Sequence, residues 1–449
     1  MARRPIVLIH GYSGNGRSFR TWVDKLIARG YDPQSVHVCS YETLTNEVTI
    51  PDIAEAFDRA LRERVGLMED EPFDAIVHST GMLVLRAWLT VYAKRRDRLK
   101  HLVGLAPATF GSPLAHKGRS WLGGVFKGRK EMGPDFLEAG DRVLDALELG
   151  SRFTWELAEK DLLGSVPCYG PNGDTPYVFI FCGTEGYGGI KKLLSEPGTD
   201  GTVRWAGCGL NVRKIKVDMT LSAPDQRIAF SAWSNVNIPM LPVAGADHGS
   251  ILSKPPEGLV DMVHAALGVE DGQALAEWKK DADSRTTGVL TKLAKWQQFV
   301  IRARDERGDP IQDYYIQLVG RRNQGRAKAL ESFALDVHTY NGDASLRSFH
   351  VNLDKLDPGS LQSLSLKVIA SSGSSLVAYS GCVSAATAAA EVHGNEGTWQ
   401  AELDLSSLLG EREVKFFYPF TTTLVELKLN REPLPLTGPN RVCRFIEPK

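Results

Sequence analysis

The stretch between residues 74 and 82 constrains the fold of this chain more than any other. It reads Asp-Ala-Ile-Val-His-Ser-Thr-Gly-Met. The apolar run 75–77 predicts a buried strand, and a helical pattern begins at Gly81. Ser79 lies at the corner between them, where backbone N–H groups at the start of the helix stabilise negative charge. The pattern matches a Gly-x-Ser-x-Gly nucleophile elbow with Val77 in place of the first glycine. Val77 therefore needs extra room from its neighbours.

The composition excludes several classes of protein. The 449 residues are 43% hydrophobic and 24% charged, which is typical of a globular chain with two or more domains. The 53 basic and 54 acidic residues give a net charge of -1, and no basic run indicates a nucleic-acid partner. Six scattered cysteines without a CxxC pair favour reduced thiols.

The chain begins with only a few residues before an apolar strand, too few for a signal peptide, and no apolar run reaches transmembrane length. We therefore expect a cytoplasmic protein. Export by a route that needs no cleaved signal remains open.

Strand and helix patterns alternate through the first 270 residues, which predicts an α/β fold with a parallel sheet covered on both sides. The predicted strands are 5–10, 36–39, 75–77, 100–105, 176–182 and 238–243. The predicted helices are 18–29, 51–65, 82–95 and 256–267. Residues 210–221 and 227–233 predict an added hairpin.

Residues 113–175 interrupt this alternation, with helix-like patterns at 136–148 and 153–163. An insertion of this length above the carboxyl ends of the strands predicts a lid or cap over an active site. The alternative is a purely structural helical insertion.

Three loops at the same end of the predicted sheet carry Ser79, Asp200 and His248. A serine hydroxyl becomes a good nucleophile only when an imidazole removes its proton, and a carboxylate holds that imidazole in the correct tautomer. We therefore predict Ser79 as nucleophile, His248 as general base and acid, and Asp200 as orienting carboxylate. Glu185 is a rival carboxylate. His78 is expected to point to the other side of the corner, either as a packing residue or as a residue that supports the catalytic groups without touching the substrate.

The glycine-rich loop after the first strand runs from His10 to Gly16. It matches neither GxGxxG nor a P-loop, so nucleotide binding is disfavoured. We predict instead that the backbone N–H groups of Tyr12 and Thr80 form an oxyanion hole.

These loops together resemble the lipase branch of the α/β-hydrolases. The sequence is similar to bacterial triacylglycerol lipases, inositol-deacylase-like lipases and lecithin–cholesterol acyltransferase-like lipases over about residues 5–268. The resemblance implies that the Gly-Ser-Pro loop covers the site and that the Asp-Gly-Thr-Val loop carries the triad acid. Val77 and Met82 depart from the family pattern. The motifs that carry the resemblance are 10–12, 78–81, 111–115, 200–203 and 247–249.

Residues 271–295 read as a polar, partly helical linker, and the remainder, 296–449, as a β-rich domain. Short strands separated by turn signals predict a β-sandwich or barrel. Predicted strands are 299–303, 314–319, 345–351, 364–369, 414–417 and 421–429. This domain either assists docking on lipid or contributes stability or oligomerisation.

The leading hypothesis is a serine hydrolase that cleaves carboxylic esters of lipids through an acyl-enzyme. We expect a lipid or small ester as its partner, transient contact with a lipid surface, and no cofactor or metal site. The oligomeric state stays open. One alternative is a phospholipase acting on membrane lipids as an exported effector. Another is a catalytically silent hydrolase fold that serves as a binding module.

Overall fold

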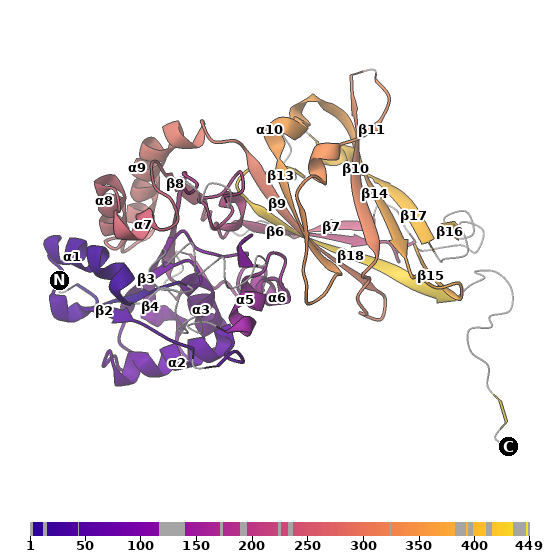
Figure 1. Ribbon diagram of the computed structural model, residues 1–449. Helices are drawn as coiled ribbons and strands as arrows, with labels where there is room; N and C mark the ends of the chain where they lie inside the picture. The colour runs from indigo at the N-terminus through magenta and orange to yellow at the C-terminus, as the bar shows by residue number, and fades with distance from the viewer. Residues whose placement is uncertain are drawn as a thin grey trace. The chain divides into compact units, whose positions relative to one another are not determined.

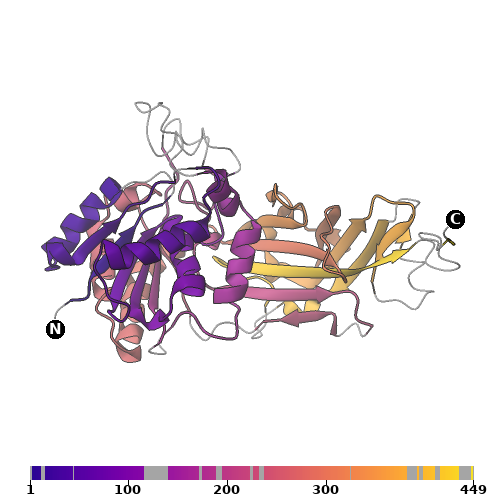
Figure 2. The ribbon, with the colours of Figure 1, turned by 90° about the horizontal axis from the view of Figure 1, so that it is seen from below.

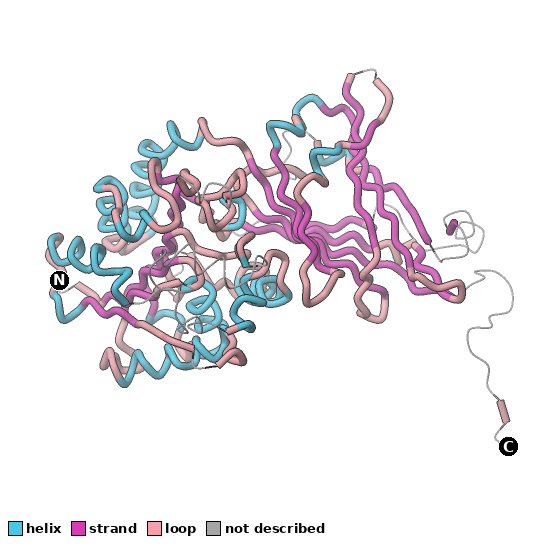
Figure 3. Tube along the Cα trace, viewed as in Figure 1, coloured by secondary structure: helices cyan, strands magenta, loops and turns pink. Residues whose placement is uncertain are grey.

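A computed structural model describes residues 3–11, 16–43, 45–115, 140–170, 174–188, 195–222, 226–231, 237–323, 325–381, 392–393, 398–409, 415–433 and 446–447. The chain forms two compact units. The first comprises Met1–Val212 and Trp233–Ala294, and the second comprises Arg213–Ala232 and Lys295–Lys449. Helices and strands mix in the first unit, whereas strands dominate the second (Figure 3).

The first unit is built on a parallel sheet in the order β2-β1-β3-β4-β5-β8 (Figure 1). The central strands are buried because their residues are almost all apolar, as expected for a sheet covered on both faces. The strands are β1 (Ile6–Ile9), β2 (Val36–Cys39), β3 (Phe73–His78), β4 (Leu99–Leu105), β5 (Tyr177–Gly183) and β8 (Met240–Val243). The predicted α/β fold is confirmed.

The helices begin and end where the sequence supplies the signals for it. In α2 (Ile50–Glu63), Thr49 and Asp52 form a reciprocal capping box, and Pro51 occupies the first turn. Its buried face carries Ile53, Phe57 and Leu61, spaced at helical intervals. The other helices are α1 (Arg20–Ala28), α3 (Gly81–Ala87), α5 (Asp141–Leu147), α6 (Arg152–Asp161), α7 (Ser250–Ser253), α8 (Glu257–Ala266) and α9 (Gly272–Leu290).

Gly104 provides room for Met82, one of the two departures from the family pattern at the elbow. It lies directly beside Val77 in the register of β3 and β4. A Cβ atom at Gly104 would come within 2.8 Å of the Met82 side chain and 2.9 Å of Ile180. The Met82 side chain is therefore accommodated by a glycine on the strand next to β3.

The insertion between β4 and β5 contains α5 and α6; residues 116–139 lie outside the described part of the chain. A buried ion pair joins α6 to α3, the helix that follows Ser79. Arg86 donates from Nε and Nη2 to the Asp161 carboxylate at 2.7 and 2.9 Å, and from Nη1 to the carbonyl of Thr109 at 2.8 Å. Tyr169 donates its hydroxyl to the same carboxylate at 2.6 Å. This part of the insertion is thus fixed to the elbow helix.

Replacing Asp161 with asparagine is expected to lower the free energy of unfolding by about 3–5 kcal/mol, because it leaves the buried Arg86 cation without a counter-charge. Thermal unfolding followed by circular dichroism measures the loss as a lower midpoint. The control is Glu156→Gln, which breaks the exposed ion pair with Arg152 on the same helix and is expected to be nearly neutral. Equal midpoints for the two variants would contradict this prediction.

Residues 271–295 differ from the linker that their polar composition indicates. Most of them form α9, a 19-residue helix capped by the Asp271 side chain. Trp278 packs against Phe179 of the central sheet with ring centroids 4.4 Å apart, and its indole N–H donates to the carbonyl of Met262. The segment is therefore an integral helix of the first unit.

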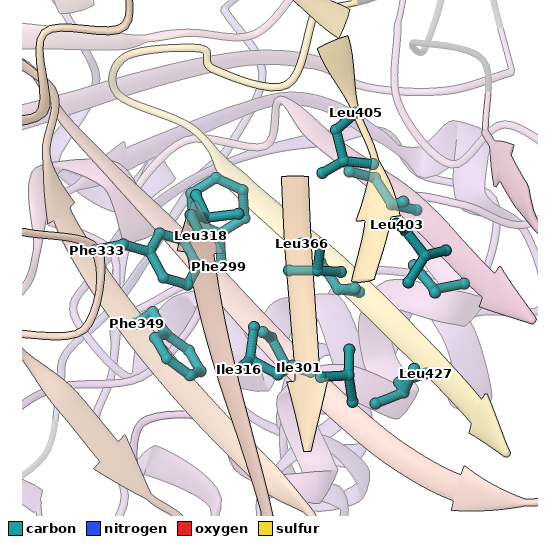
Figure 4. Close-up of a cluster of buried hydrophobic side chains, with 14 of the residues drawn as sticks. Phe299, Ile301, Ile316, Leu318, Phe333, Phe349, Leu366, Leu403, Leu405 and Leu427 are labelled. Carbon is teal, nitrogen blue, oxygen red and sulfur yellow. The ribbon is translucent and has the colours of Figure 1, made fainter. Parts of the chain in front are cut away.

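The second unit is a sandwich of two sheets, within the predicted class of C-terminal β-domain. One sheet has the order β11-β10-β14-β17-β16 and the other the order β12-β13-β9-β18-β6-β7, with β15 also paired to β18. Apolar side chains from both sheets meet in one core, including Phe299, Leu318 and Leu427 (Figure 4). Its strands are β6 (Val212–Asp218), β7 (Ile228–Phe230), β9 (Trp296–Asp305), β10 (Tyr314–Arg322), β11 (Lys328–Ala329), β12 (Val337–Thr339), β13 (Leu346–Asn352), β14 (Leu361–Ser371), β15 (Val377–Ser380), β16 (Val392–His393), β17 (Thr398–Asp404) and β18 (Thr422–Pro433). A short helix, α10 (Leu353–Leu356), follows β13.

Two expectations for the β-strands need correction. The hairpin β6–β7 forms where expected, but it extends the sheet of the second unit rather than that of the first, as Figure 2 shows with β6 (magenta) beside β18 (yellow). The strand expected at 414–417 is not formed in its described part, 415–417. None of the described helices is long and apolar enough to cross a membrane.

Candidate active site

Ser79 occupies a strained corner between β3 and α3. Its φ angle is 52°, in the left-handed region that a non-glycine residue adopts only where the surrounding structure imposes it. The corner is held by hydrogen bonds, because Ser79 donates its N–H to the carbonyl of Leu105 and its own carbonyl accepts from the N–H of Ala108. Two glycines allow the close approach of neighbouring backbone. A Cβ at Gly11 would lie 2.6 Å from Cβ of Ser79, and one at Gly81 would lie 2.7 Å from the carbonyl oxygen of Ile9.

Asp200 and His248 meet at the same edge of the sheet. His248 Nδ1 lies 2.9 Å from Asp200 Oδ2, and both side chains are completely buried. The His248 N–H also donates to the Asp200 carbonyl at 3.0 Å. Asp200 Oδ1 accepts the backbone N–H groups of Thr202 and Val203 at 3.0 and 2.8 Å. The carboxylate is thereby fixed with its other oxygen directed at the imidazole.

His78 joins the serine corner to the histidine loop, which differs from the expectation that it points away. Its Nε2 lies 3.0 Å from the carbonyl oxygen of His248, and the two imidazole rings lie 4.6 Å apart at a tilt of 47°. Burial, followed by the proximity of His248, lowers the pKa of His78 well below the ordinary histidine value. A neutral His78 that donates from Nε2 therefore ties the backbone of His248 to the residue that precedes Ser79.

Of the two residues predicted to form the oxyanion hole, Thr80 lies in the described part of the chain. Thr80 is fully buried in the first turn at the start of α3, with helical backbone angles. Tyr12 lies outside the described residues. The loop that leads to it is anchored by His10, whose Nε2 accepts the N–H of Tyr41 at 3.2 Å and whose Nδ1 therefore donates to the carbonyl of Gly11 at 2.8 Å. The ring of Tyr41 stacks on that imidazole.

The rival carboxylate Glu185 and the neighbouring Asp247 have other hydrogen-bond partners. Glu185 is exposed and accepts a hydrogen bond from Thr184 at 3.4 Å. Asp247 Oδ1 accepts the backbone N–H groups of Gly249 and Ser250 and so shapes the histidine loop. Sequence reasoning missed Cys182, whose Sγ lies 3.6 Å from Asp200 Oδ2. A lone cysteine at the end of an apolar strand gives no signal of such a contact.

A cavity of about 540 Å³ opens beside the anchored loop. Its lining combines charged, exposed residues of α2 with buried apolar residues, Ile9, Ile53, Phe57 and Val84. Ser40, on its wall, lies 3.2 Å from Nε2 of His10. Within the described ranges, no group of three or more His, Cys, Asp or Glu side chains could hold a metal ion.

A parallel sheet with a serine elbow, a histidine loop and an acid loop at one edge defines the α/β-hydrolase fold, and this chain has that fold. Its structure is similar to that of phospholipase PlaB from Legionella pneumophila, with a TM-score of 0.77 and 22% identity over 100% of this chain and 98% of that chain. A second structure of that phospholipase, in complex with thio-NAD, matches with the same TM-score and identity over 99% and 97% of the two chains.

The lipase BlEst2 from Bacillus licheniformis, in its mature form, also matches, with a TM-score of 0.38 and 16% identity over 59% of this chain and 92% of that chain. No protein-family model matches the sequence. The search of curated protein sequences finds no significant match either.

Proposed function

We propose that this protein is a serine hydrolase that cleaves carboxylic esters of lipids. The observation that carries the proposal is the arrangement of Asp200, His248 and the strained Ser79 corner, joined through His78. A non-glycine residue with a positive φ at a strand–helix corner carries a conformational free-energy cost. A turn with a purely structural role would avoid that cost by using glycine. A functional hydroxyl at this position accounts for the serine.

The proposed reaction proceeds in two acyl transfers. His248 Nε2 takes the proton of Ser79 Oγ as the oxygen attacks the ester carbonyl carbon. The N–H groups of Thr80 and Tyr12 stabilise the developing oxyanion. The imidazolium then gives its proton to the leaving alcohol, which departs and leaves an acyl-enzyme. Water, activated by the same histidine, releases the fatty acid and restores Ser79. Asp200 holds Nδ1–H and stabilises the imidazolium at each step.

Two observations support a lipid as the acyl donor. The cavity next to the His10 loop is lined by both apolar and charged residues, which suits an amphiphile. The similarity to a phospholipase extends over the whole chain, second unit included. Within the proposed class, this second observation favours a phospholipase.

The test is hydrolysis of p-nitrophenyl esters from acetate to palmitate, together with fatty-acid release from phosphatidylcholine and phosphatidylglycerol vesicles. The expected result is a preference for long chains and release of fatty acid from vesicles. Activity confined to short chains would identify a carboxylesterase and reject the lipid substrate. A wild-type protein that turns over no ester and resists a fluorophosphonate probe would reject the enzyme and favour the silent binding module.

A further inference from the structure

Two buried cysteines extend the hydrogen-bond chain of the acid loop away from His248. Cys182, near the end of β5, has its Sγ 3.6 Å from Asp200 Oδ2, the same oxygen that faces His248 Nδ1. Cys208 Sγ lies 3.4 Å from Cys182 Sγ. Both cysteines are free and completely buried. The contacts therefore connect a pair of thiols to the carboxylate of the site described above.

The chemistry of these three groups determines which one donates in each hydrogen bond. An ionised carboxylate can only accept hydrogen bonds, so the proton in the contact with Asp200 belongs to Cys182. The sulfur of Cys182 is then available to accept from the thiol of Cys208. Burial raises the pKa of Cys182 well above that of a free thiol, and burial also raises the pKa of Cys208. Both thiols therefore stay protonated and serve as donors, not as nucleophiles.

The two oxygens of Asp200 are engaged differently. Oδ1 accepts two short backbone hydrogen bonds, from Thr202 and Val203. Oδ2 accepts from His248 and also from the weak donor Cys182. A second donor to Oδ2 restrains the carboxylate against rotation and takes a share of its charge that would otherwise act on the imidazole.

We propose that Cys182, supported by Cys208, is a positioning residue of the active site that holds Asp200 Oδ2 against His248 and moderates the charge facing the imidazole. This inference rests on the proposed function for its catalytic meaning. The hydrogen-bond chain itself is independent of that function.

The experiment compares Cys182→Ala, Cys182→Ser and Cys208→Ala with the wild type. The control is Cys168→Ala, which removes another buried free cysteine. Because alanine removes the donor, more of the carboxylate charge faces His248 and stabilises its protonated form. We expect kcat to fall about three- to tenfold with KM unchanged, and the acid limb of the pH profile of kcat/KM to move to higher pH. Cys208→Ala should act in the same direction with a smaller effect, and Cys182→Ser, which keeps a donor, should restore most of the activity.

A readout independent of turnover is the titration of His248 in protein labelled with ¹⁵N-histidine, assigned by the signal lost in His248→Asn. The titration midpoint is expected to rise in Cys182→Ala and to stay at the wild-type value in Cys168→Ala. An unchanged midpoint in a folded Cys182→Ala protein would overturn the positioning role, whatever happens to kcat. If the wild type hydrolysed no ester, the proposed function would fail, and the titration would still decide whether the thiol acts on the Asp200–His248 pair.

Discussion

Replacing Ser79 with alanine is expected to lower kcat for ester hydrolysis by about 10⁴- to 10⁶-fold, because no other hydroxyl can form the acyl-enzyme and only binding and oxyanion stabilisation remain. The measurement is the initial rate on the best ester of the substrate panel, with the same protein tested for labelling by a fluorophosphonate probe. We expect labelling to disappear together with turnover.

The control for this variant is Ser284→Ala, which removes an exposed serine from α9 and should leave both rate and labelling unchanged. The strained φ of 52° at Ser79 also predicts the thermal stability of the variant. Alanine at this corner keeps the strain and loses only the hydroxyl, so the thermal midpoint is expected to stay close to that of the wild type. Retained turnover in Ser79→Ala would reject Ser79 as the nucleophile.

Replacing Asp200 with asparagine is expected to lower kcat by about 10⁴-fold. The reason lies in the two hydrogen bonds from Thr202 and Val203 to Oδ1. These donors require an oxygen, so the new amide must turn its NH₂ group toward His248. The imidazole then accepts at Nδ1 and carries its proton on Nε2, where it can no longer take a proton from Ser79.

The matched control is Glu185→Gln, the same chemical change at the rival carboxylate. Because Glu185 is exposed and contacts Thr184 rather than His248, this variant should retain wild-type kcat. The pair of variants is measured on one substrate across the pH range. Loss of activity in Glu185→Gln with retention in Asp200→Asn would exchange the two assignments.

Much of the first unit could be predicted because its signals are local. Continuous apolar runs of four to seven residues predict strands buried on both faces. The ends of β1, β2 and β4 each lie within one residue of the predicted ends. The serine corner and the order of the acid and histidine loops could be predicted from the sequence for the same reason. Each depends on a few residues adjacent in sequence.

The features that sequence reasoning missed depend on partners far along the chain. Polar composition made residues 271–295 look like a linker, because the burial of Trp278 against Phe179 is a tertiary contact. The room for Met82 is provided by Gly104 on a separate strand. The approach of Cys182 to Asp200 likewise joins strand β5 to a separate loop. No periodicity or propensity encodes such contacts.

The hairpin β6–β7 has a consequence for how the protein is made. It leaves the ribosome long before its partner strand β18, which is synthesised roughly 200 residues later at a rate of about 5–20 residues per second. For tens of seconds the hairpin has no sheet of the second unit to join, while the strands of the first unit that precede it, β1 to β5, have already been synthesised. An unpaired strand of this kind is a site for mispairing with other chains. The alternation of Lys214 and Lys216 with apolar residues in β6 places charge along the waiting strand, which opposes association between nascent chains.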